Sequence, residues 1–493
     1  MRVLFASSEV FPLIKTGGLA DVSGALPAAL AAAGADMRIL LPGYPEAMDK
    51  AEGKRQLGPL GDPYGIGATT LVSAKLPGSG VPVWLLDCPA LFDRPGGPYQ
   101  DPAGHDWPDN DLRFGLLSWA AAHLCTEASP VKWRPQVLHA NDWQTGLAPA
   151  YLHAWNTVGR PGTVFTVHNI AYQGQFPATA VARLGFPSEM FAIDGFEYYS
   201  QLSFLKAGLF YSDKLTTVSP RYAKEVQTAA FGCGIEGLLA QRSADLTGIL
   251  NGADYGVWDP ATDPYIPHPY SAADLTGKAQ NKAALQAELG LAVDPDVPLM
   301  VIVSRFNDHK GMDLVLAVLP AILKMGAQLA VVGSGDHSLE DAFTSAAAML
   351  PNQVAVRLGY SEELAHRLMA GGDILLMPSR FEPCGLTQFY AFRYGTVPVA
   401  HTTGGLADTV MDTTYDTLMT GTATGFAFEH MNAGAFQWAV ERAVALFAQK
   451  PQWRKVQAAC QRQEFGWQQA AGHYLDLYRK LATGNGTKSR RRA

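Results

Sequence analysis

The 493-residue sequence has few cysteines, few charged residues and no long apolar run. Its five cysteines are odd in number, widely spaced and form no Cys-x-x-Cys pair, so neither a disulfide framework nor a zinc knuckle is indicated. No apolar run reaches the roughly 18 residues that a membrane-spanning helix needs. The apolar run at the start is too short for a secretory signal. These absences predict a cytoplasmic protein.

Positive charge is also in short supply. Lys plus Arg total 38 against 45 Asp plus Glu, which leaves a formal net charge of −7. Binding along a phosphate backbone needs a basic surface, so we expect no nucleic acid partner and, without a span, no membrane. Any phosphate group that the protein binds must therefore be bound at a local site rather than by an extended basic surface. The basic end, residues 488–493, is interpreted as a frayed, solvated tail.

The length and the 48% hydrophobic content suit two or three globular domains. Short runs rich in Val, Ile and Leu alternate with stretches suited to helices, which is typical of crossover units on parallel sheets. The expected strands are 3–6, 37–41, 83–86, 137–139 and 163–167 in the first half, and 300–303, 328–332, 354–358, 374–377 and 397–400 in the second. The expected helices are 111–124, 143–155, 312–324, 362–369 and 386–394.

The fold class is therefore α/β, with two doubly wound, Rossmann-like domains whose ligand loops face a central cleft. Residues 248–269 are dense in Gly, Asp, Asn and Pro, which places the domain change there. We predict an N-terminal domain over 1–248 and a second over 249–467.

One six-residue segment occurs twice, as Thr-Gly-Gly-Leu-Ala-Asp at 16–21 and again at 403–408. Each copy follows a strand-like run and precedes a helix-like one. Such turns lie at the carboxyl ends of strands, where doubly wound sheets bind ligands. The two copies could equally be strand-to-helix turns without shared chemistry.

The first copy carries Lys15 directly before it. Gly17 and Gly18 let backbone N–H groups approach an anion, the helix N-terminus adds partial positive charge, and Lys15 adds a full one. This suits a phosphate, but the spacing is not that of a P-loop, and a structural turn fits the residues as well.

Two cations follow the expected strand 300–303, namely Arg305 and Lys310. Arg offers a rigid fork to pairs of oxygens and Lys offers a compact charge, so together they suit a diphosphate and could neutralise a departing nucleotide. A solvated surface role is the alternative.

The segment after strand 374–377 holds Glu382, a carboxylate that can accept hydrogen bonds from sugar hydroxyls. The N–H groups of Leu386 and Thr387 open the next helix and could bind phosphate. Cys384 lies between them without an identifiable His or Asn partner and is interpreted as a packed thiol.

In the first half, Asp142 and His168 each follow a strand and so fall at a sheet end. With Glu382 they could mimic a glycosidase pair, in which a carboxylic acid protonates a poor leaving group. A nucleoside diphosphate needs no such acid once its charge is offset, and the cations beside phosphate-type turns favour that reading.

These residues resemble a known family, the bacterial glycogen synthases and plant starch synthases, which are retaining glucosyltransferases of the GT-B fold. The resemblance covers nearly the whole chain. It is carried by seven motifs in order, at 15–22, 139–143, 168–174, 231–234, 248–252, 379–385 and 403–408. It implies transfer of glucose from ADP-glucose to the non-reducing end of an α-1,4-glucan (glycogen), without a cofactor or metal.

The resemblance also implies roles for individual residues. Lys15, Gly17 and Gly18 would lie near the donor diphosphate and glucose, and Arg305 and Lys310 would neutralise the diphosphate. Glu382 would hold glucose hydroxyls, His168 would sit beside the glucose, Asp142 would shape the sugar pocket, and Tyr360 would contact the adenine. The last helix, within 468–493, would cross back to the first domain.

Two departures from the family pattern are visible: His309 stands where Gln is usual, and Ala230 stands where an acidic residue is common. Three alternatives stay open: a UDP-glucose donor, a starch-synthase type of enzyme, and a non-catalytic glucan-binding relative. A glucan phosphorylase is disfavoured, because members of that group are much longer and carry pyridoxal phosphate.

Overall fold

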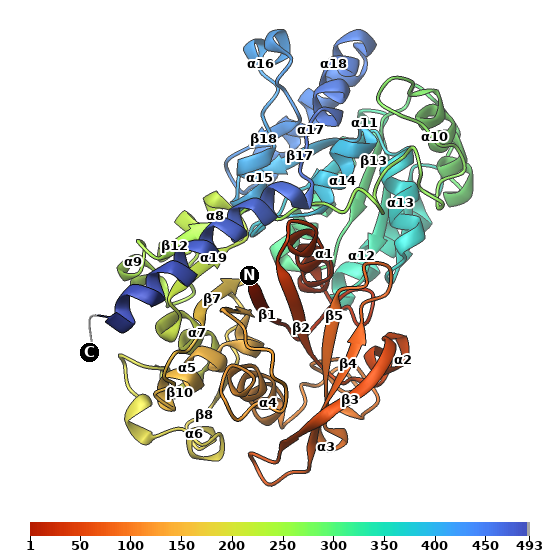
Figure 1. Cartoon of the computed structure of the whole chain (residues 1–493). Coiled ribbons are helices and arrows are strands. Elements are labelled where there is room, and N and C mark those ends of the chain that lie inside the picture. Colours follow the sequence, from red (N-terminus) through yellow and green to blue (C-terminus); the bar gives the residue numbers. More distant parts are fainter. Residues whose placement is uncertain (491–493) are drawn as a thin grey trace. The chain divides into compact units, whose positions relative to one another are not determined.

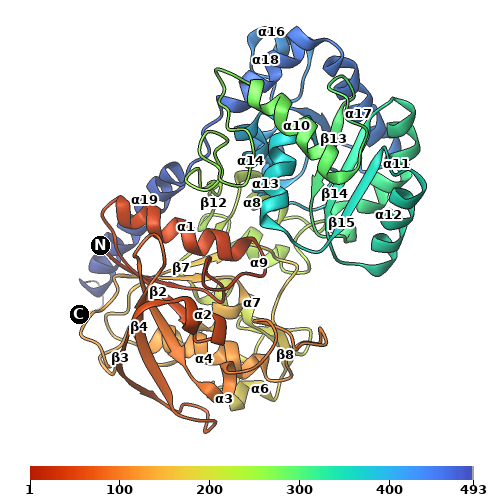
Figure 2. The same cartoon turned by 90° about the vertical axis from the view of Figure 1, so that its right-hand side faces the viewer.

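The computed structural model describes the backbone of residues 1–490 and the side chains of residues 1–482. The predicted basic tail, 488–493, lies outside the described side chains. The chain forms two compact units (Figures 1 and 2). Unit 1 consists of Met1–Gly252 with the residues from Trp467 onward, and unit 2 is Ala253–Gly466.

Unit 1 is built on a nine-stranded sheet in the order β12-β11-β7-β6-β1-β2-β5-β4-β3. Its strands are β1 (Arg2–Ala6), β2 (Asp36–Pro42), β3 (Glu52–Gly61), β4 (Thr69–Lys75), β5 (Pro82–Asp87), β6 (Val137–Asn141), β7 (Gly162–Val167), β11 (Lys214–Thr217) and β12 (Leu246–Gly248). The pairs from β12 to β5 are parallel, and β4 and β3 add an antiparallel edge. A small antiparallel sheet joins β8 (Gln175–Pro177), β10 (Gln201–Ser203) and β9 (Glu197–Tyr198).

Five parallel strands of unit 1, namely β1, β2, β5, β6 and β7, form where the apolar runs predicted them, because strands covered on both faces must be apolar throughout. The parallel strands β11 and β12 and the antiparallel β4 were not predicted. The edge strand β3 was not predicted. Most of its residues are exposed and it contains no apolar run, so it carries no burial signal.

The helices of unit 1 are α1 (Gly18–Ala32), α2 (Pro45–Lys50), α3 (Pro89–Phe92), α4 (Asn110–His123), η1 (Trp143–Thr145), α5 (Leu147–Ala154), α6 (Ala180–Arg183), η2 (Ser188–Met190), α7 (Phe204–Tyr211), α8 (Pro220–Glu225), α9 (Glu236–Gln241) and α19 (Trp467–Arg490). The predicted helix 143–155 is thus η1 followed by α5.

Helix α19 returns the chain to unit 1, where it lies beside α1 and against β6 and β7 (Figure 2). Its apolar face, which includes Tyr474 and Tyr478, is part of the buried core of this unit. The Tyr478 hydroxyl forms a 2.6 Å hydrogen bond with Nδ1 of His139, a fully buried residue of β6. Helix α19 therefore completes the hydrophobic core of unit 1, to which β1 and α1 also belong.

Unit 2 holds a six-stranded, fully parallel sheet in the order β15-β14-β13-β16-β17-β18. Its strands are β13 (Leu299–Val303), β14 (Gln328–Gly333), β15 (Val354–Leu358), β16 (Ile374–Met377), β17 (Val397–His401) and β18 (Phe426–Phe428). Its helices are α10 (Thr276–Leu289), η3 (Asp308–Lys310), α11 (Met312–Lys324), α12 (His337–Met349), α13 (Glu362–Gly371), α14 (Thr387–Tyr394), α15 (Gly404–Thr409), α16 (Tyr415–Thr420), α17 (Ala433–Phe447) and α18 (Lys450–Gln461).

The strand order of unit 2 reverses at β13, whose neighbours are β14 on one side and β16 on the other. In doubly wound sheets ligands bind where the order reverses, beyond the carboxyl ends of the strands. The loops that follow β13 and β16 are therefore expected to form the ligand-binding site of this unit. Within the described residues, no helix is both long and apolar enough to cross a membrane.

Candidate active site

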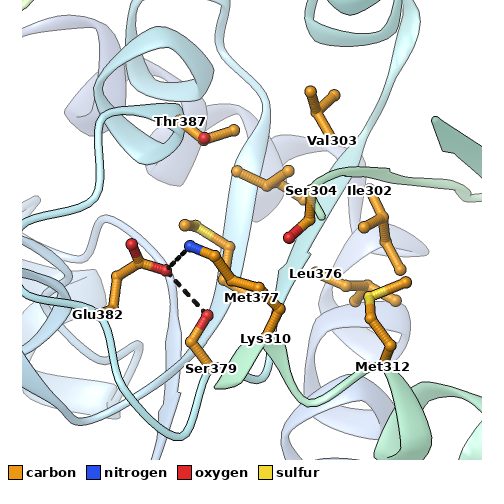
Figure 3. Close-up of a pocket in the computed structure, with 11 residues that line it drawn as sticks. Ile302, Val303, Ser304, Lys310, Met312, Leu376, Met377, Ser379, Glu382 and Thr387 are labelled. Atoms are coloured by element: carbon orange, nitrogen blue, oxygen red, sulfur yellow. Dashed lines mark hydrogen bonds and ion pairs between the residues drawn. The ribbon is translucent and has the colours of Figure 1, made fainter. Parts of the chain in front are cut away.

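Lys310 and Glu382 meet at the carboxyl ends of β13 and β16 (Figure 3). Lys310 Nζ donates to Glu382 Oε2 at 2.6 Å, and Ser379 Oγ donates to the same oxygen at 2.9 Å. Only 8% of the Glu382 side chain is exposed, against 24% of Lys310. Both residues line a small cavity together with Ser304 and Thr387. The Glu382 carboxylate is thus nearly buried and accepts hydrogen bonds from Lys310 and Ser379, while the Lys310 side chain remains partly exposed to solvent.

The loop that carries Lys310 is fixed by its own backbone. Asn307 caps η3 by accepting the Lys310 N–H at 3.1 Å. Gly311 follows with φ at +67°, and a Cβ built there would lie 1.9 Å from the carbonyl oxygen of Pro378. The loops after β13 and β16 therefore touch backbone to backbone, and glycine is the residue that permits it.

A bidentate ion pair also joins these two loops. Arg380, which follows β16, donates to both oxygens of Asp313 at 2.6 Å and to the carbonyl oxygen of Asp308 at 2.7 Å. Asp313 lies in the first turn of α11, just beyond Lys310. The pair sets the spacing between Lys310 and Glu382, and it was not predicted from the sequence.

The second copy of the repeated segment packs directly on the Glu382 loop. A Cβ on Gly404, whose φ is +44°, would lie 2.0 Å from the Glu382 carbonyl oxygen. A Cβ on Gly405 would lie 2.0 Å from the carbonyl oxygen of Cys384, itself buried. Close packing against the carbonyl oxygens of Glu382 and Cys384 explains why glycine occupies positions 404 and 405. The copy at 403–408 therefore supports the Glu382 loop.

Helix α14 opens beside this cluster. Leu386 is its N-cap residue and Thr387 its first helical residue, and no side chain caps it. Among the described residues, no hydrogen bond uses the N–H of Leu386 or of Thr387. These N–H groups and the partial positive charge of the helix end are the usual features of an anion site.

Arg305 and Tyr360 are not among the residues that line this cavity. Arg305 follows β13, is exposed, and its guanidinium makes no hydrogen bond or ion pair with a described residue. Tyr360 follows β15 and is 68% exposed. The structure thus brings Lys310, Glu382 and Thr387 together, while Arg305 and Tyr360 follow β13 and β15, which are separated in the sheet by β14.

In unit 1, the loop between β1 and α1 holds Lys15, which pairs with Asp21 at 2.9 Å. The buried carboxylate of Glu9 accepts the N–H groups of Thr16 and of Gly17, the latter at 3.1 Å. The Gly17 N–H is therefore engaged by Glu9 in this structure. Burial raises the pKa of Glu9, and the hydroxyl of Tyr99 donates to its other oxygen.

Gly17 and Gly18 differ from the glycines of the second copy. A Cβ at either position would meet nothing within 4 Å. The φ of Gly17 is −156°, which any residue adopts. Neither backbone strain nor packing among the described residues requires glycine at these two positions.

Asp142 lies at the carboxyl end of β6 with φ at +55°, a conformation that is rare for residues other than glycine. Its Oδ1 accepts the N–H of His168 at 2.8 Å and that of Asn169 at 3.4 Å. The loops after β6 and β7 are tied together in this way. Burial raises the pKa of Asp142 to about 7.

His168 is oriented by Asn141, whose side-chain oxygen lies 3.0 Å from Nε2. Because that oxygen can only accept, the proton sits on Nε2 and Nδ1 remains an acceptor. Burial lowers the pKa of His168 to about 3, so the imidazole is neutral. Among the described residues, no three His, Cys, Asp or Glu side chains are grouped to hold a metal ion.

Comparison with known proteins decides the family. The family described as Starch synthase catalytic domain matches residues 2–241, and the family Glycosyl transferases group 1 matches residues 290–455. A curated glycogen synthase of Paramagnetospirillum magneticum is 74% identical to this chain over 100% of both sequences. The chain belongs to the glycogen synthase family. It is a hexosyltransferase with the two-domain GT-B fold, which confirms the family, fold class and activity predicted from the sequence.

Other members of this family show the same extent of match. The glycogen synthase of Nitrosospira multiformis is 48% identical and covers 98% of this chain and 97% of its own. The catalytic domain of starch synthase IV from Arabidopsis thaliana, solved with ADP and acarbose, aligns with a TM-score of 0.88 at 31% identity over 98% of this chain and 99% of that one. Members of this family use a nucleotide-sugar donor and a glucan acceptor.

Proposed function

We propose that this enzyme transfers glucose from ADP-glucose to the non-reducing 4-hydroxyl of an α-1,4-glucan, with retention of configuration. The observation that carries the proposal is the Lys310–Glu382 pair beside the uncapped start of α14. A cation, a carboxylate and free N–H groups at the point of strand-order reversal are what a sugar diphosphate requires. The starch synthase IV structure with ADP supports adenine as the base.

In unit 2, Lys310 and Arg305 neutralise the diphosphate, and the N–H groups of Leu386 and Thr387 donate hydrogen bonds to its remaining oxygens. Glu382 holds hydroxyls of the glucose. In the structure Lys310 is bound to Glu382 at 2.6 Å, so an incoming phosphate competes for the ammonium and frees one carboxylate oxygen for the sugar. Tyr360, exposed after β15, is assigned to the adenine on resemblance.

In unit 1, the loop at Gly17 and Gly18 gives the donor the space that a side chain would fill. Lys15 adds positive charge on exchange of its partner Asp21. Asp142 shapes the sugar pocket, and the neutral His168 sits beside the glucose, where it can exchange hydrogen bonds without adding charge. Residues of both units thus serve the same reaction.

The mechanism that we propose is departure of ADP with positive charge building on the glucose ring, followed by attack of the acceptor from the same face. The leaving phosphate oxygen takes the proton of the acceptor hydroxyl, so no protein base is needed. Lys310 and Arg305 act in this step because negative charge grows on the phosphate as the bond breaks. The competing route is a double displacement through Asp142 or Glu382.

Incubation of the purified enzyme with glycogen and donor labelled in the glucose tests the proposal. We expect label in glycogen from ADP-glucose and much less from UDP-glucose at equal concentration, with release by an enzyme that cleaves α-1,4 bonds. Preferred transfer from UDP-glucose would overturn the assignment of the base. A glucosyl-enzyme adduct trapped on Asp142 or Glu382 would overturn the same-face step.

We also propose that the enzyme works in the cytoplasm. All five cysteines are free, and four of them are buried. A reducing compartment keeps thiols in this state. Cell fractionation with an antibody against the native chain would check it.

A further inference from the structure

Unit 1 contains a cavity of about 210 Å³ that the proposed reaction does not use. Its lining comes from four separate segments: Ile14, Tyr44 and the start of α2, the loop 92–98, and the residues Trp107 and Arg113. Glu46 and Gly96 line it and are exposed, so the cavity opens to solvent. It has room for several water molecules or one small solute.

Arg113 is a buried cation of this lining without a carboxylate partner. It is 1% exposed. Its Nε donates to the carbonyl oxygen of Leu91 at 2.9 Å, and its Nη1 donates to the carbonyl oxygen of Pro98 and to Asn110 Oδ1, each at 2.7 Å. All of these acceptors are neutral, and no hydrogen bond to a described residue uses Nη2. Burying a charge in this way is costly unless an anion compensates it.

Two further side chains of the lining are donors without a described acceptor. The Tyr44 hydroxyl is buried and makes no hydrogen bond to any described residue, and the same holds for the indole nitrogen of Trp107. An indole N–H can only donate, and a phenol donates readily. Orphaned polar atoms of this kind are few in native proteins, and here both line one cavity.

The other charged groups near the cavity are already paired. Arg94 donates to both oxygens of Asp109 at 2.8 and 2.6 Å. Glu46 pairs with Lys50 at 2.6 Å. Arg113 therefore carries a positive charge in the lining without a directly bonded carboxylate among the described residues, and its guanidinium lies 5.6 to 5.9 Å from the rings of Phe92, Trp107 and Phe114.

We propose that this cavity binds a phosphate group, as inorganic phosphate or as a small phosphate monoester. The lining residues Arg113, Tyr44 and Trp107 carry donors without a described acceptor, and the guanidinium adds positive charge, a combination that favours an anion rich in acceptor oxygens. Tyr44 comes from one segment of the lining, and Trp107 and Arg113 come from another. A tetrahedral phosphate presents oxygens in several directions, whereas a carboxylate presents both of its oxygens in one plane.

An occupant of this cavity would lie near the residues that hold the loop containing Gly17 and Gly18. Arg113 holds the Pro98 carbonyl, and the next residue, Tyr99, donates its hydroxyl to Glu9. Glu9 in turn accepts the Gly17 N–H. Ile14, directly before Lys15, lines the cavity itself. The cavity thus offers a route by which phosphate could change the affinity of the enzyme for its donor.

Isothermal titration of the full-length enzyme with inorganic phosphate tests the proposal. The titration uses Arg305→Ala/Lys310→Ala, because these cations of unit 2 are themselves assigned to phosphate. We expect binding to persist in that variant, and to weaken about tenfold when Tyr44→Phe and Trp107→Phe are added, since each removes one donor to a charged acceptor. Glucose 1-phosphate distinguishes a monoester from free phosphate, and glucose is the neutral control.

Three results would overturn the phosphate site: no binding of either phosphate compound, loss of binding in Arg305→Ala/Lys310→Ala alone, or unchanged affinity after the Tyr44 and Trp107 substitutions. The readout is binding rather than turnover, so it is independent of whether the proposed transfer reaction is correct. Circular dichroism and the melting temperature of each variant establish that it is folded.

Discussion

Asp142 is a buried carboxyl in a strained backbone position, and its titration has a measurable effect on stability. Its pKa is raised from an ordinary value near 3.8 to about 7. Between these values the folded protein binds the proton more tightly than the unfolded chain does. The contribution of protonated Asp142 to the free energy of unfolding is therefore present below about pH 4 and is lost as the pH rises through 7.

We predict that Asp142→Asn removes this pH dependence. Relative to the variant, the wild type should lose stability between pH 4 and pH 7, by about 4 kcal/mol at most for a shift of this size. Urea unfolding of both proteins at several pH values in this range measures the difference. A stability difference that does not change with pH would show that Asp142 titrates normally.

The sequence placed Lys310 and Glu382 each at the carboxyl end of its own strand, but it did not predict that they meet. They meet because β13 and β16 are neighbours in a parallel sheet. Glu9 was missed. Its partners, Tyr99 and the loop at Thr16, are joined to it only by the fold. Tyr99 lies 90 positions after Glu9, and nothing in the intervening sequence signals the pair. The orphaned donors around Arg113 were missed for the same reason.

At the scale of elements, the close contact between the loops after β13 and β16 depends on one glycine. A Cβ at Gly311 would lie 1.9 Å from a carbonyl oxygen, whereas one at Gly326, at the other end of α11, would meet nothing within 4 Å. Both residues have positive φ, of 67° and 78°. The two positions therefore separate the steric cost from the conformational cost.

We predict that Gly326→Ala costs about 1 kcal/mol, the conformational penalty alone, and that Gly311→Ala costs at least about 3 kcal/mol. Gly311→Ala should also reduce turnover because it displaces Lys310. Chemical unfolding and transfer assays of both variants check this. Equal destabilisation by the two substitutions would contradict the proposed loop contact.

The repeated segment illustrates what a sequence pattern leaves open. Both copies precede a helix, as predicted, but Gly404 and Gly405 pack on the Glu382 loop, while a Cβ at Gly17 or Gly18 would have no described atom within 4 Å. The glycines in the two copies of this six-residue sequence are therefore present for different physical reasons. Only the positions of neighbouring carbonyl oxygens, which depend on the whole fold, distinguish them.

For the whole molecule, the two units differ in how the chain completes them. Unit 2 is one continuous segment that contains all six strands of its sheet. Unit 1 needs α19, whose Tyr474 and Tyr478 are almost fully buried in its core. Burial of one such aromatic side chain contributes about 3 kcal/mol, so unit 1 without the helix exposes much of its stabilising surface.

We therefore predict that residues 253–466 expressed alone fold cooperatively, and that residues 1–252 alone do not unless a peptide of 467–493 is added. Near-ultraviolet circular dichroism and resistance to proteolysis report the folded state of each piece. A stable, cooperatively unfolding 1–252 without the peptide would show that α19 is dispensable for this core.

The central claim is that Lys310, held by Glu382, stabilises the departing diphosphate, and the turnover number of Lys310→Ala tests it most directly. Lys324→Ala is the matched control, because Lys324 is an exposed lysine at the far end of α11. With saturating ADP-glucose and glycogen, we predict that Lys310→Ala loses roughly a hundredfold or more in turnover while remaining folded. Lys324→Ala should keep the wild-type rate. A folded Lys310→Ala enzyme with near-normal turnover would contradict the account.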